Sequence, residues 1–201
     1  MVKIRDYVRM FFSIFWAWLY IPHYIVYACM NRTKLNMDID RYAKTYSLIM
    51  PHFFYLMFLL HNNWAFRTLF YYRIGPIPSL LIGWWRPKDK YFDISYTTQL
   101  DGGTYFAHPS STIINANYIG KNFSARQFTT IGNKRDGDNV NRPYIGDNVT
   151  LGTNVTIIGA IRIGNNVTIG AGSVVVKDIP DNCIAVGNPC IPIKFLESKL
   201  E

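Results

Sequence analysis

Cysteine and histidine are scarce in this chain. Its 201 residues include three cysteines, Cys29, Cys183 and Cys190, an odd and sparse set that does not indicate a disulfide framework. Structural zinc usually takes four Cys or His ligands, and no histidine lies near Cys183 or Cys190 in the sequence. We therefore expect no bound metal. A zinc enzyme on several histidines is disfavoured, because residues 93–201 contain only His108.

Acidic residues are few in the first half of the chain. Residues 1–92 carry 12 Lys and Arg against 4 Asp and Glu, whereas residues 93–201 carry 9 of each. Of the 32 aromatic residues, 24 also precede residue 93. The uneven split predicts two domains: a basic, aromatic-rich helical module over 1–92 and a second domain over 93–201, joined near Arg86–Lys90. The basic residues are scattered rather than striped, so we expect no nucleic-acid partner.

Charged residues are absent from Met10 to Met30, a run of 21 residues rich in Phe, Trp and Tyr. Basic residues flank both ends of this run, and no small-residue cleavage site follows it, so we do not expect a signal peptide. Rings with polar tips beside Lys and Arg suit the lipid headgroup boundary. The preferred interpretation is a cytoplasmic protein lying peripherally on the inner face of the membrane. An oligomerising helical domain and a true membrane span remain alternatives.

Apolar patterning in the first half predicts helices at about 4–20, 40–60 and 63–74. The last of these contains Arg67 and Arg73 among aromatic residues. We expect these two arginines to be surface or inter-domain charges rather than catalytic groups.

A six-residue period runs from Ile145 to Val175 without a slip. Ile145, Leu151, Ile157, Ile163, Ile169 and Val175 open successive units, and a further small or aliphatic position recurs four residues into each unit. This period fits neither a helix nor a hairpin strand, and it predicts a β-helix of hexapeptide repeats. The aliphatic residues should stack inward. Glycines follow four of the opening residues and are expected to turn the corners at φ values that other residues resist; they are Gly146, Gly152, Gly164 and Gly170.

The repeat resembles that of the hexapeptide-repeat acyltransferases, in particular the serine acetyltransferase-like branch, which includes O-acetyltransferases of bacterial surface polysaccharides. The segments Tyr144–Val149 and Ile169–Pro180 and the exit Gly187–Pro189 carry the resemblance, which covers about residues 93 to 195. It implies that the coils wind as a left-handed parallel β-helix. The expected fold is thus mainly β, with an α-helical N-terminal module.

The segment Leu100–His108 resembles the family segment that ends in the catalytic histidine. An imidazole suits this role because transfer from a thioester to an alcohol needs a base near neutral pH, which can then protonate the departing thiolate. The resemblance also places Asp93 where a carboxylate orients the histidine, and assigns Asp101 to the acceptor. Corner and turn roles are the alternatives for His108 and Asp93.

One coil should contain 18 residues, so the residue that stacks on His108 one rung away falls at Arg126 or Gln127. Gln127 is a candidate to bind the acceptor or orient the histidine, and a corner residue is the alternative. The period fails over residues 133–144, a polar insertion of the kind that builds a wall over a site. In the resembling transferases, a loop here reaches the site that adjacent subunits share.

This loop departs from the serine acetyltransferase pattern. Those enzymes have an Asp before the catalytic histidine and an Arg-His pair before the loop proline, whereas this chain has Ala107 and Asn141-Arg142. Loss of the Asp removes a charge partner for an ammonium group, so a neutral sugar hydroxyl fits better than serine. Asn141, Arg142, Tyr144 and Gln127 are the predicted acceptor-binding residues.

The resemblance implies acetyl-CoA as co-substrate, bound in a groove between neighbouring subunits of a homotrimer or a dimer of trimers. Five residues near the C-terminal coils are assigned to it: Gly159, Ala160, Ala171, Gly172 and Lys177. For Lys177, a solvated charge is the alternative.

The sequence thus favours an acetyl-CoA-dependent O-acetyltransferase that modifies a sugar hydroxyl in bacterial surface polysaccharide biosynthesis, by direct transfer with His108 as general base. Serine O-acetyltransferase of cysteine biosynthesis is the alternative enzyme. A non-catalytic hexapeptide scaffold is the third hypothesis.

Overall fold

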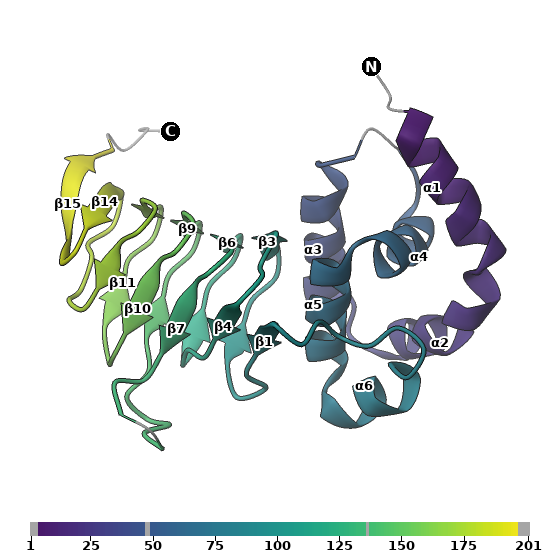
Figure 1. Cartoon of the computed structure of the whole chain (residues 1–201), viewed down its shortest axis with the longest axis horizontal. Coiled ribbons are helices and arrows are strands. Elements are labelled where there is room, and N and C mark those ends of the chain that lie inside the picture. Colours follow the sequence, from purple (N-terminus) through teal and green to yellow (C-terminus); the bar gives the residue numbers. More distant parts are fainter. Residues whose placement is uncertain (1–3, 47–48, 136, 197–201) are drawn as a thin grey trace. The chain divides into compact units, whose positions relative to one another are not determined.

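The computed structural model describes residues 4–46, 49–135 and 137–196, and the chain divides into two compact units, Met1–Lys90 and Tyr91–Glu201 (Figure 1). The first unit is helical and the second is a β-solenoid. Residues 47 and 48 of the predicted 40–60 helix, and Asp136 of the predicted loop, lie outside the described residues.

The first unit consists of helices α1 (Ile4–Phe15), α2 (Ile21–Cys29), α3 (Thr33–Ala43), α4 (His52–Asn62), α5 (Trp64–Ile74) and α6 (Pro76–Ile82), with a 3-10 turn at Ala17–Tyr20. Asn63 caps α5 by accepting a hydrogen bond from the Phe66 N–H, and Gly75 ends it at a φ of 86°. The predicted 40–60 helix is wrong in extent, since α3 ends at Ala43 and α4 begins after Pro51. The predicted 4–20 helix ends at Phe15, and α2, α6 and most of α3 were not predicted.

The core of this unit lies between α4 and α5, where Leu56, Phe58, Phe66 and Phe70 are fully buried. Such burial is the main source of stability in a helical domain. No single helix within the described ranges is long and apolar enough to cross a membrane. The segments Ile4–Phe15 and Ala17–Cys29 are together long and apolar enough, but they are bent by 70° relative to each other.

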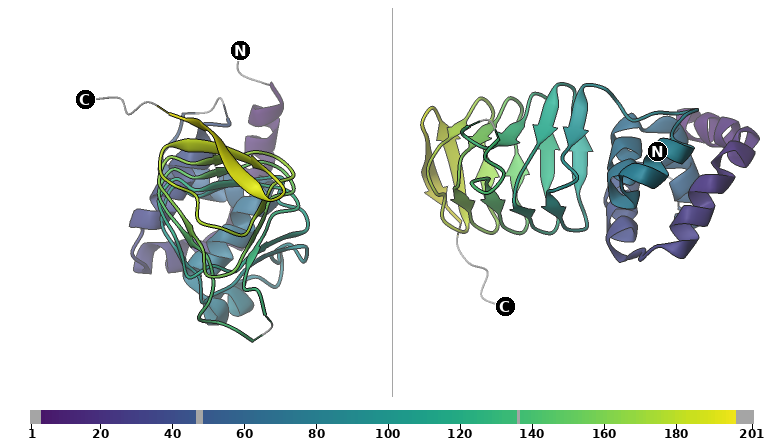
Figure 2. Two further views of the ribbon diagram at one scale, coloured as in Figure 1. Left: turned by 90° about the vertical axis from the view of Figure 1, so that its left-hand side faces the viewer. Right: turned by 90° about the horizontal axis from the view of Figure 1, so that it is seen from below.

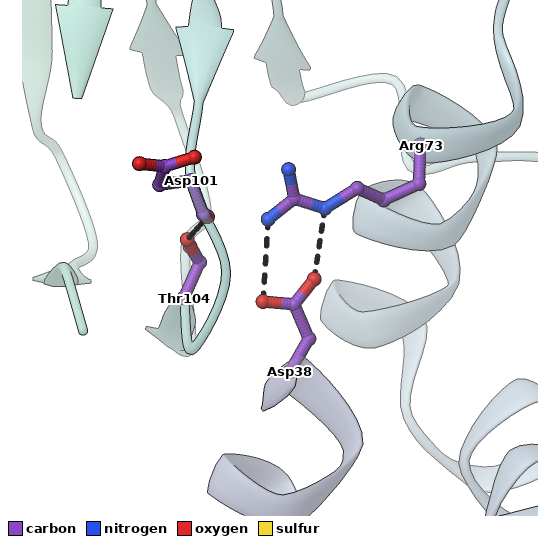
Figure 3. A network of polar contacts seen from close by, with 4 residues as sticks. All are labelled: Asp38, Arg73, Asp101 and Thr104. Carbon is purple, nitrogen blue, oxygen red and sulfur yellow. Dashed lines mark hydrogen bonds and ion pairs between the residues drawn. The ribbon is translucent and has the colours of Figure 1, made fainter. Parts of the chain in front are cut away.

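A buried ion pair joins α3 to α5. The Arg73 Nε lies 2.8 Å from the Asp38 Oδ2, and the Arg73 Nη2 lies 3.2 Å from the Asp38 Oδ1 (Figure 3). The exposed fractions of the two side chains are 5% and 0%. Of the two roles predicted for Arg73, that of a surface charge is wrong, because the fork of its guanidinium binds a buried carboxylate inside the helical unit, and the inter-domain role stays a prediction.

The second unit is a parallel solenoid of three sheets, each made of strands from successive coils (Figures 1 and 2). Sheet A contains β1 (Phe92–Ile94), β4 (Thr112–Ile114), β7 (Thr130–Gly132), β10 (Thr156–Ile158) and β13 (Val174–Val175). Sheet B contains β2 (Gln99–Leu100), β5 (Tyr118–Ile119), β8 (Tyr144–Ile145) and β11 (Arg162–Ile163). Sheet C contains β3 (Tyr105–Ala107), β6 (Ser124–Arg126), β9 (Thr150–Leu151), β12 (Thr168–Ile169), β14 (Cys183–Gly187) and β15 (Cys190–Phe195).

The chain visits the sheets in the order A, B, C in each of the first four coils, and in the last an isolated Ile163–Ile179 bridge stands in place of the sheet B strand. The solenoid therefore has three edges, which we name A–B, B–C and C–A after the sheets that meet there. The predicted opening residues, such as Ile145, Ile157 and Ile169, are fully buried and fill the interior. The exit segment Gly187–Pro189 forms the turn of the antiparallel β14–β15 hairpin. The predicted left-handed parallel β-helix with N-terminal helices is confirmed.

The expectation that the repeat glycines adopt φ values that other residues resist is wrong. Gly146, Gly152, Gly164 and Gly170 are absent from the residues with positive φ. A Cβ on Gly146 would instead lie 2.8 Å from the Gly164 carbonyl oxygen one coil away, so these positions are small because adjacent coils approach closely.

From the second coil on, asparagines have positive φ values at the B–C edge. Asn122, Asn148, Asn166 and Asn182 have φ values of 58°, 57°, 56° and 54°. Each of the first three donates its side-chain amide to the next one along the edge, at 2.9, 2.9 and 2.8 Å. This ladder holds the corners at a conformation that asparagine tolerates better than most residues.

Candidate active site

His108 lies at the C–A edge on a local enlargement of the first coil. Ala107 pairs with Arg126, nineteen positions later, whereas Ile113 pairs with Thr130, seventeen positions later. The difference means that the first coil has two more residues at this edge than the second. These are His108 and Pro109, because the Phe128 N–H bonds the Ser110 carbonyl as the repeat requires.

The enlargement presents the histidine to solvent. His108 is exposed and has a φ of 53°, a value that ordinary residues seldom adopt, while the adjacent Pro109 is buried. The His108 carbonyl accepts a hydrogen bond from the Ser110 N–H at 2.7 Å, which closes the bulge. A side chain on a short, closed bulge of a rigid coil is well placed to meet a ligand.

Gln127 occupies the same edge in the next coil. It follows Arg126, the partner of Ala107, so it comes directly after the rung on which the bulge begins. Its carbonyl accepts hydrogen bonds from the Asn154 N–H and the Thr153 hydroxyl, and its side chain is half-buried. The expectation that the residue next to His108 in the following coil lies about 18 positions later was close, because the two extra residues of the first coil are confined to this edge.

Asp93 lies in the middle of β1, opposite Ile113 of β4, and its side chain is exposed on sheet A. This strand is the first of the solenoid and lies one coil before β4, which follows the His108 bulge. The predicted role of Asp93 in orienting His108 stays a prediction.

The segment between β7 and β8 leaves the solenoid at the A–B edge and projects outward (Figures 1 and 2). Arg142 anchors its return. The guanidinium donates to the Asn117 Oδ1 at 3.1 Å, the Thr97 hydroxyl at 2.6 Å and the Asn115 Oδ1 at 2.8 Å, and the residue is only 8% exposed. All three acceptors are neutral, so these hydrogen bonds hold the loop without neutralising the arginine.

The tip of the loop is held by Asp138. Its Oδ1 accepts from the Asn141 N–H at 3.0 Å and from the Val140 N–H at 3.3 Å, and its Oδ2 accepts from the Asn141 side-chain amide at 2.9 Å. The Asn141 side-chain and backbone hydrogen bonds lower the pKa of Asp138 from its ordinary value. Asn141 is exposed, and the Asp138 carboxylate orients its side-chain amide nitrogen.

Tyr144 belongs to a column of side chains on sheet B. Its ring stacks on that of Tyr118 with centroids 4.7 Å apart and an interplanar angle of 22°, and the Arg162 guanidinium lies 4.6 Å from its centroid on the next coil. The Tyr118 hydroxyl donates to the Asp101 Oδ2 at 2.8 Å. This bond raises the pKa of Tyr118 to about 12, because ionisation would remove the donor from a carboxylate.

Asp101 itself lies at the B–C edge, where β2 has ended. Its carbonyl accepts a hydrogen bond from the Thr104 hydroxyl at 3.0 Å, which tightens the turn into β3 (Figure 3).

The predicted site residues therefore occupy different edges of one solenoid. His108 and Gln127 share the C–A edge, and Asn141 and Arg142 share the A–B edge. Tyr144 lies on sheet B just beyond the loop, and Asp101 lies at the B–C edge. The structure brings together the two pairs but not the whole set.

The residues assigned to acetyl-CoA divide in the same way. Ala171 and Gly172 lie between β12 and β13, on the C–A edge of His108, and both are exposed. Gly159 and Ala160 lie between β10 and β11, and the exposed Lys177 follows β13, all toward the A–B edge. The Gly172 and Gly159 N–H groups are already bonded to the Thr153 and Gly132 carbonyls of the preceding coil.

Sequence reasoning missed Tyr118, Arg162 and the two asparagines, Asn115 and Asn117, that accept hydrogen bonds from Arg142. The eighteen-residue period does link Tyr144 to Arg162. Tyr118 is twenty-six positions before Tyr144, because the loop adds eight residues to that coil, so a fixed period could not find it.

A parallel hexapeptide solenoid with one histidine on an edge bulge and a projecting loop defines an acyltransferase of the hexapeptide class. Comparison with known proteins agrees. The family described as bacterial transferase hexapeptide (six repeats) matches residues 142–177. WcaB of Escherichia coli K12, which carries the name of a colanic acid biosynthesis acetyltransferase, is 40% identical over 130 residues, 64% of this chain and 74% of WcaB.

Two serine acetyltransferases are also similar. Serine acetyltransferase 4 of Arabidopsis thaliana is 34% identical over 110 residues, 53% of this chain and 30% of that protein. The crystal structure of Neisseria gonorrhoeae serine acetyltransferase matches the fold with a TM-score of 0.68 at 23% identity, over 88% of this chain and 70% of that one. The chain belongs to the hexapeptide-repeat transferase family, in the branch that holds WcaB and the serine acetyltransferases, and is an O-acetyltransferase.

Proposed function

We propose that the protein transfers an acetyl group from acetyl-CoA to a sugar hydroxyl during the synthesis of a bacterial surface polysaccharide. The observation that carries the proposal is the exposed His108 on its two-residue bulge, with Gln127 in the next coil. The relation to WcaB, whose name includes colanic acid biosynthesis, supports a saccharide acceptor.

In the proposed reaction, a ring nitrogen of His108 removes the proton of the acceptor hydroxyl as its oxygen attacks the thioester carbonyl carbon. The tetrahedral intermediate then collapses, the carbon–sulfur bond breaks, and the imidazolium returns the proton to the departing thiolate. Asp93 is proposed to orient the imidazole, while Gln127, Asn141, Arg142, Tyr144 and Asp101 bind the acceptor. Gly159, Ala160, Ala171, Gly172 and Lys177 are proposed to line the acetyl-CoA groove.

We further propose that the working enzyme is a homotrimer with sites between subunits. One solenoid carries its histidine on the C–A edge and its loop on the A–B edge, so a complete site would combine the histidine of one subunit with the loop of the next. This arrangement would also unite the two groups of residues assigned to acetyl-CoA. A dimer of such trimers remains compatible with it.

Mixed oligomers test the composite site. We expect His108→Ala and the double variant Asn141→Ala/Tyr144→Ala each to lose most transfer activity with a neutral saccharide. After co-expression, random mixing would restore about one quarter of the sites if each combines two subunits. No recovery above the two separate variants would refute the shared site, and undiminished activity of His108→Ala would refute the proposed base.

Serine O-acetylation is the second candidate, because the fold matches serine acetyltransferases over most of the chain. Ala107 before the histidine argues against it, since no carboxylate is present there for an ammonium group. Thiol release from acetyl-CoA, compared between L-serine and a panel of neutral saccharides, distinguishes the two. Faster turnover with serine would displace the saccharide proposal.

A further inference from the structure

Helix α1 is amphipathic in the reverse sense to most helices of a folded domain. Its buried residues are Asp6 and Ser13, which are 3% and 0% exposed. The Ser13 hydroxyl accepts a hydrogen bond from the Asn62 side chain of α4 at 2.7 Å and donates to the Arg9 carbonyl at 2.8 Å. The polar side of α1 is therefore the side that packs into the helical unit.

The apolar side of α1 faces outward. Its exposed side chains recur at helical spacing of three and four residues, so they form one stripe. Phe11 is 70% exposed and Phe15 is 66% exposed, and the members of the stripe are Ile4, Tyr7, Val8, Phe11, Phe12, Ile14 and Phe15. An apolar surface of this continuity marks an interaction site rather than ordinary surface scatter.

The following turn and α2 extend the stripe. Trp18, Ile21 and Ile25 are exposed by 62%, 55% and 59%. Between α1, α2 and α4 lies a groove of about 350 Å³, lined almost wholly by apolar side chains that include Ile14, Trp18, Ile21, Tyr24 and Phe53. We name the α1 stripe, these three residues and this groove the apolar face.

The charge around the apolar face selects the kind of partner. Arg5 is exposed beside the stripe on α1, Arg9 lies half-buried one turn further, and Arg32 is exposed after α2. The first 92 residues carry three times as many basic as acidic residues, 12 against 4. Apolar and aromatic side chains flanked by Arg and Lys match a surface whose interior is hydrocarbon and whose headgroups are anionic.

We propose that the apolar face docks on an anionic phospholipid bilayer, with α1 lying along the surface and the groove receiving part of a lipid acyl chain. A second copy of the chain is the competing occupant. It fits less well, because two such faces brought together would also bring their arginine borders together. The proposal concerns lipid binding and stands apart from the acetyl-transfer proposal.

Vesicle sedimentation of the full chain tests it. The probe is phosphatidylcholine vesicles containing about one third phosphatidylglycerol, compared with pure phosphatidylcholine. Wild type should sediment with the anionic vesicles, and Phe11→Ser/Phe15→Ser should bind more than about tenfold more weakly, since each Phe contributes apolar area to the contact. Arg5→Gln/Arg9→Gln should weaken binding by roughly fivefold per charge at low salt.

The matched control is Ile191→Ser/Ile193→Ser in β15 of the solenoid, which removes two apolar side chains that are 59% and 61% exposed. It should bind vesicles as wild type does. Circular dichroism and thermal melting of each variant establish that it is folded. Bromine-labelled lipid should quench the tryptophan emission of wild type, and Trp18→Phe should lose most of that quenching if the groove holds a chain.

Three results would overturn the proposal. These are wild type that stays in the supernatant, equal binding to neutral and anionic vesicles, and equal binding by Phe11→Ser/Phe15→Ser. Light scattering without lipid gives a fourth: if Phe11→Ser/Phe15→Ser forms a smaller assembly than wild type, a second copy covers the face instead. Loss of acetyl transfer in an activity assay would not affect these outcomes.

Discussion

Replacing Arg142 with alanine should release the loop between β7 and β8 without unfolding the solenoid. The guanidinium makes three hydrogen bonds, of 3.1, 2.6 and 2.8 Å, to acceptors on Asn117, Thr97 and Asn115. A buried charged donor would contribute up to about 3 kcal/mol per bond. The three acceptors are themselves exposed or half-buried, so water can replace the donor, and we take about 1 kcal/mol for each bond.

The total, about 3 kcal/mol, should appear as local opening, because the coils on either side keep their own ladder hydrogen bonds. Opening by that amount raises amide exchange roughly 100-fold. The N–H groups to follow are those of Val140 and Asn141, which both bond to Asp138. Hydrogen exchange by mass spectrometry or NMR measures them directly, and global thermal unfolding should shift by only a few degrees.

Arg162→Ala is the matched control. It also removes an arginine near the loop, but that guanidinium only lies over the Tyr144 ring on an exposed surface, so loop exchange should change less than about threefold. Unchanged exchange at Val140 and Asn141 in Arg142→Ala would refute the anchoring argument. If the variant lost affinity for the acceptor while the loop stayed protected, Arg142 would act through its proposed contact with the acceptor and not as an anchor of the loop.

Three further predictions concern stability. Burial lowers the pKa of His23 to about 4, so between pH 6.5 and 4 the unfolded chain binds more protons than the folded chain. The free energy of unfolding should therefore fall as pH falls through that range, and urea titrations should show a smaller fall for His23→Gln. Asn148→Ala should lower the free energy of unfolding by about 2 kcal/mol, because it removes two hydrogen bonds of the asparagine ladder at a residue with positive φ. Asn148→Gly should lower it by less, because glycine adopts positive φ readily, and equal losses in the two variants would assign the effect to the hydrogen bonds alone. Because the pKa of Tyr118 is raised to about 12, the stability that it contributes is present below pH 10 and is lost as pH rises from about 10 to 12. In chemical unfolding over that range, the stability of Tyr118→Phe should depend less on pH than that of wild type. An identical dependence would show that the Tyr118–Asp101 hydrogen bond does not cause the loss.

The solenoid could be predicted from the sequence because its signal is repeated. Ile145, Ile157 and Ile169 each fill an equivalent interior position, so the other repeats would still reveal the period if one residue were assigned wrongly. The bulge at His108 could not be predicted, because an average of eighteen residues per coil does not reveal that one edge has gained two. That information lies in the strand register, where Ala107 pairs with Arg126 and Ile113 with Thr130.

The orientation of α1 could not be predicted from its helical period alone. A helical period shows that Phe11 and Phe15 lie on one side and Asp6 and Ser13 on the other, but the period has the same strength whichever side is buried. The usual rule, apolar side inward, would have inverted this helix. On its buried polar side, the Asn62 side chain of α4 donates a hydrogen bond to Ser13, a contact between residues 49 positions apart that the period of α1 does not reveal.

A closed solenoid limits where a site can be built. Its interior is filled by residues such as Ile157 and Val167, which are fully buried, and its coils are bonded to one another at every rung, so an added residue can only leave outward at an edge. This chain does so at His108–Pro109 on the C–A edge and between β7 and β8 on the A–B edge. Two departures on different edges of a rigid prism cannot approach each other by bending it. If both serve one reaction, as we propose, a second subunit must supply one of them, and for that reason the mixed-oligomer experiment tests the site more directly than any single substitution.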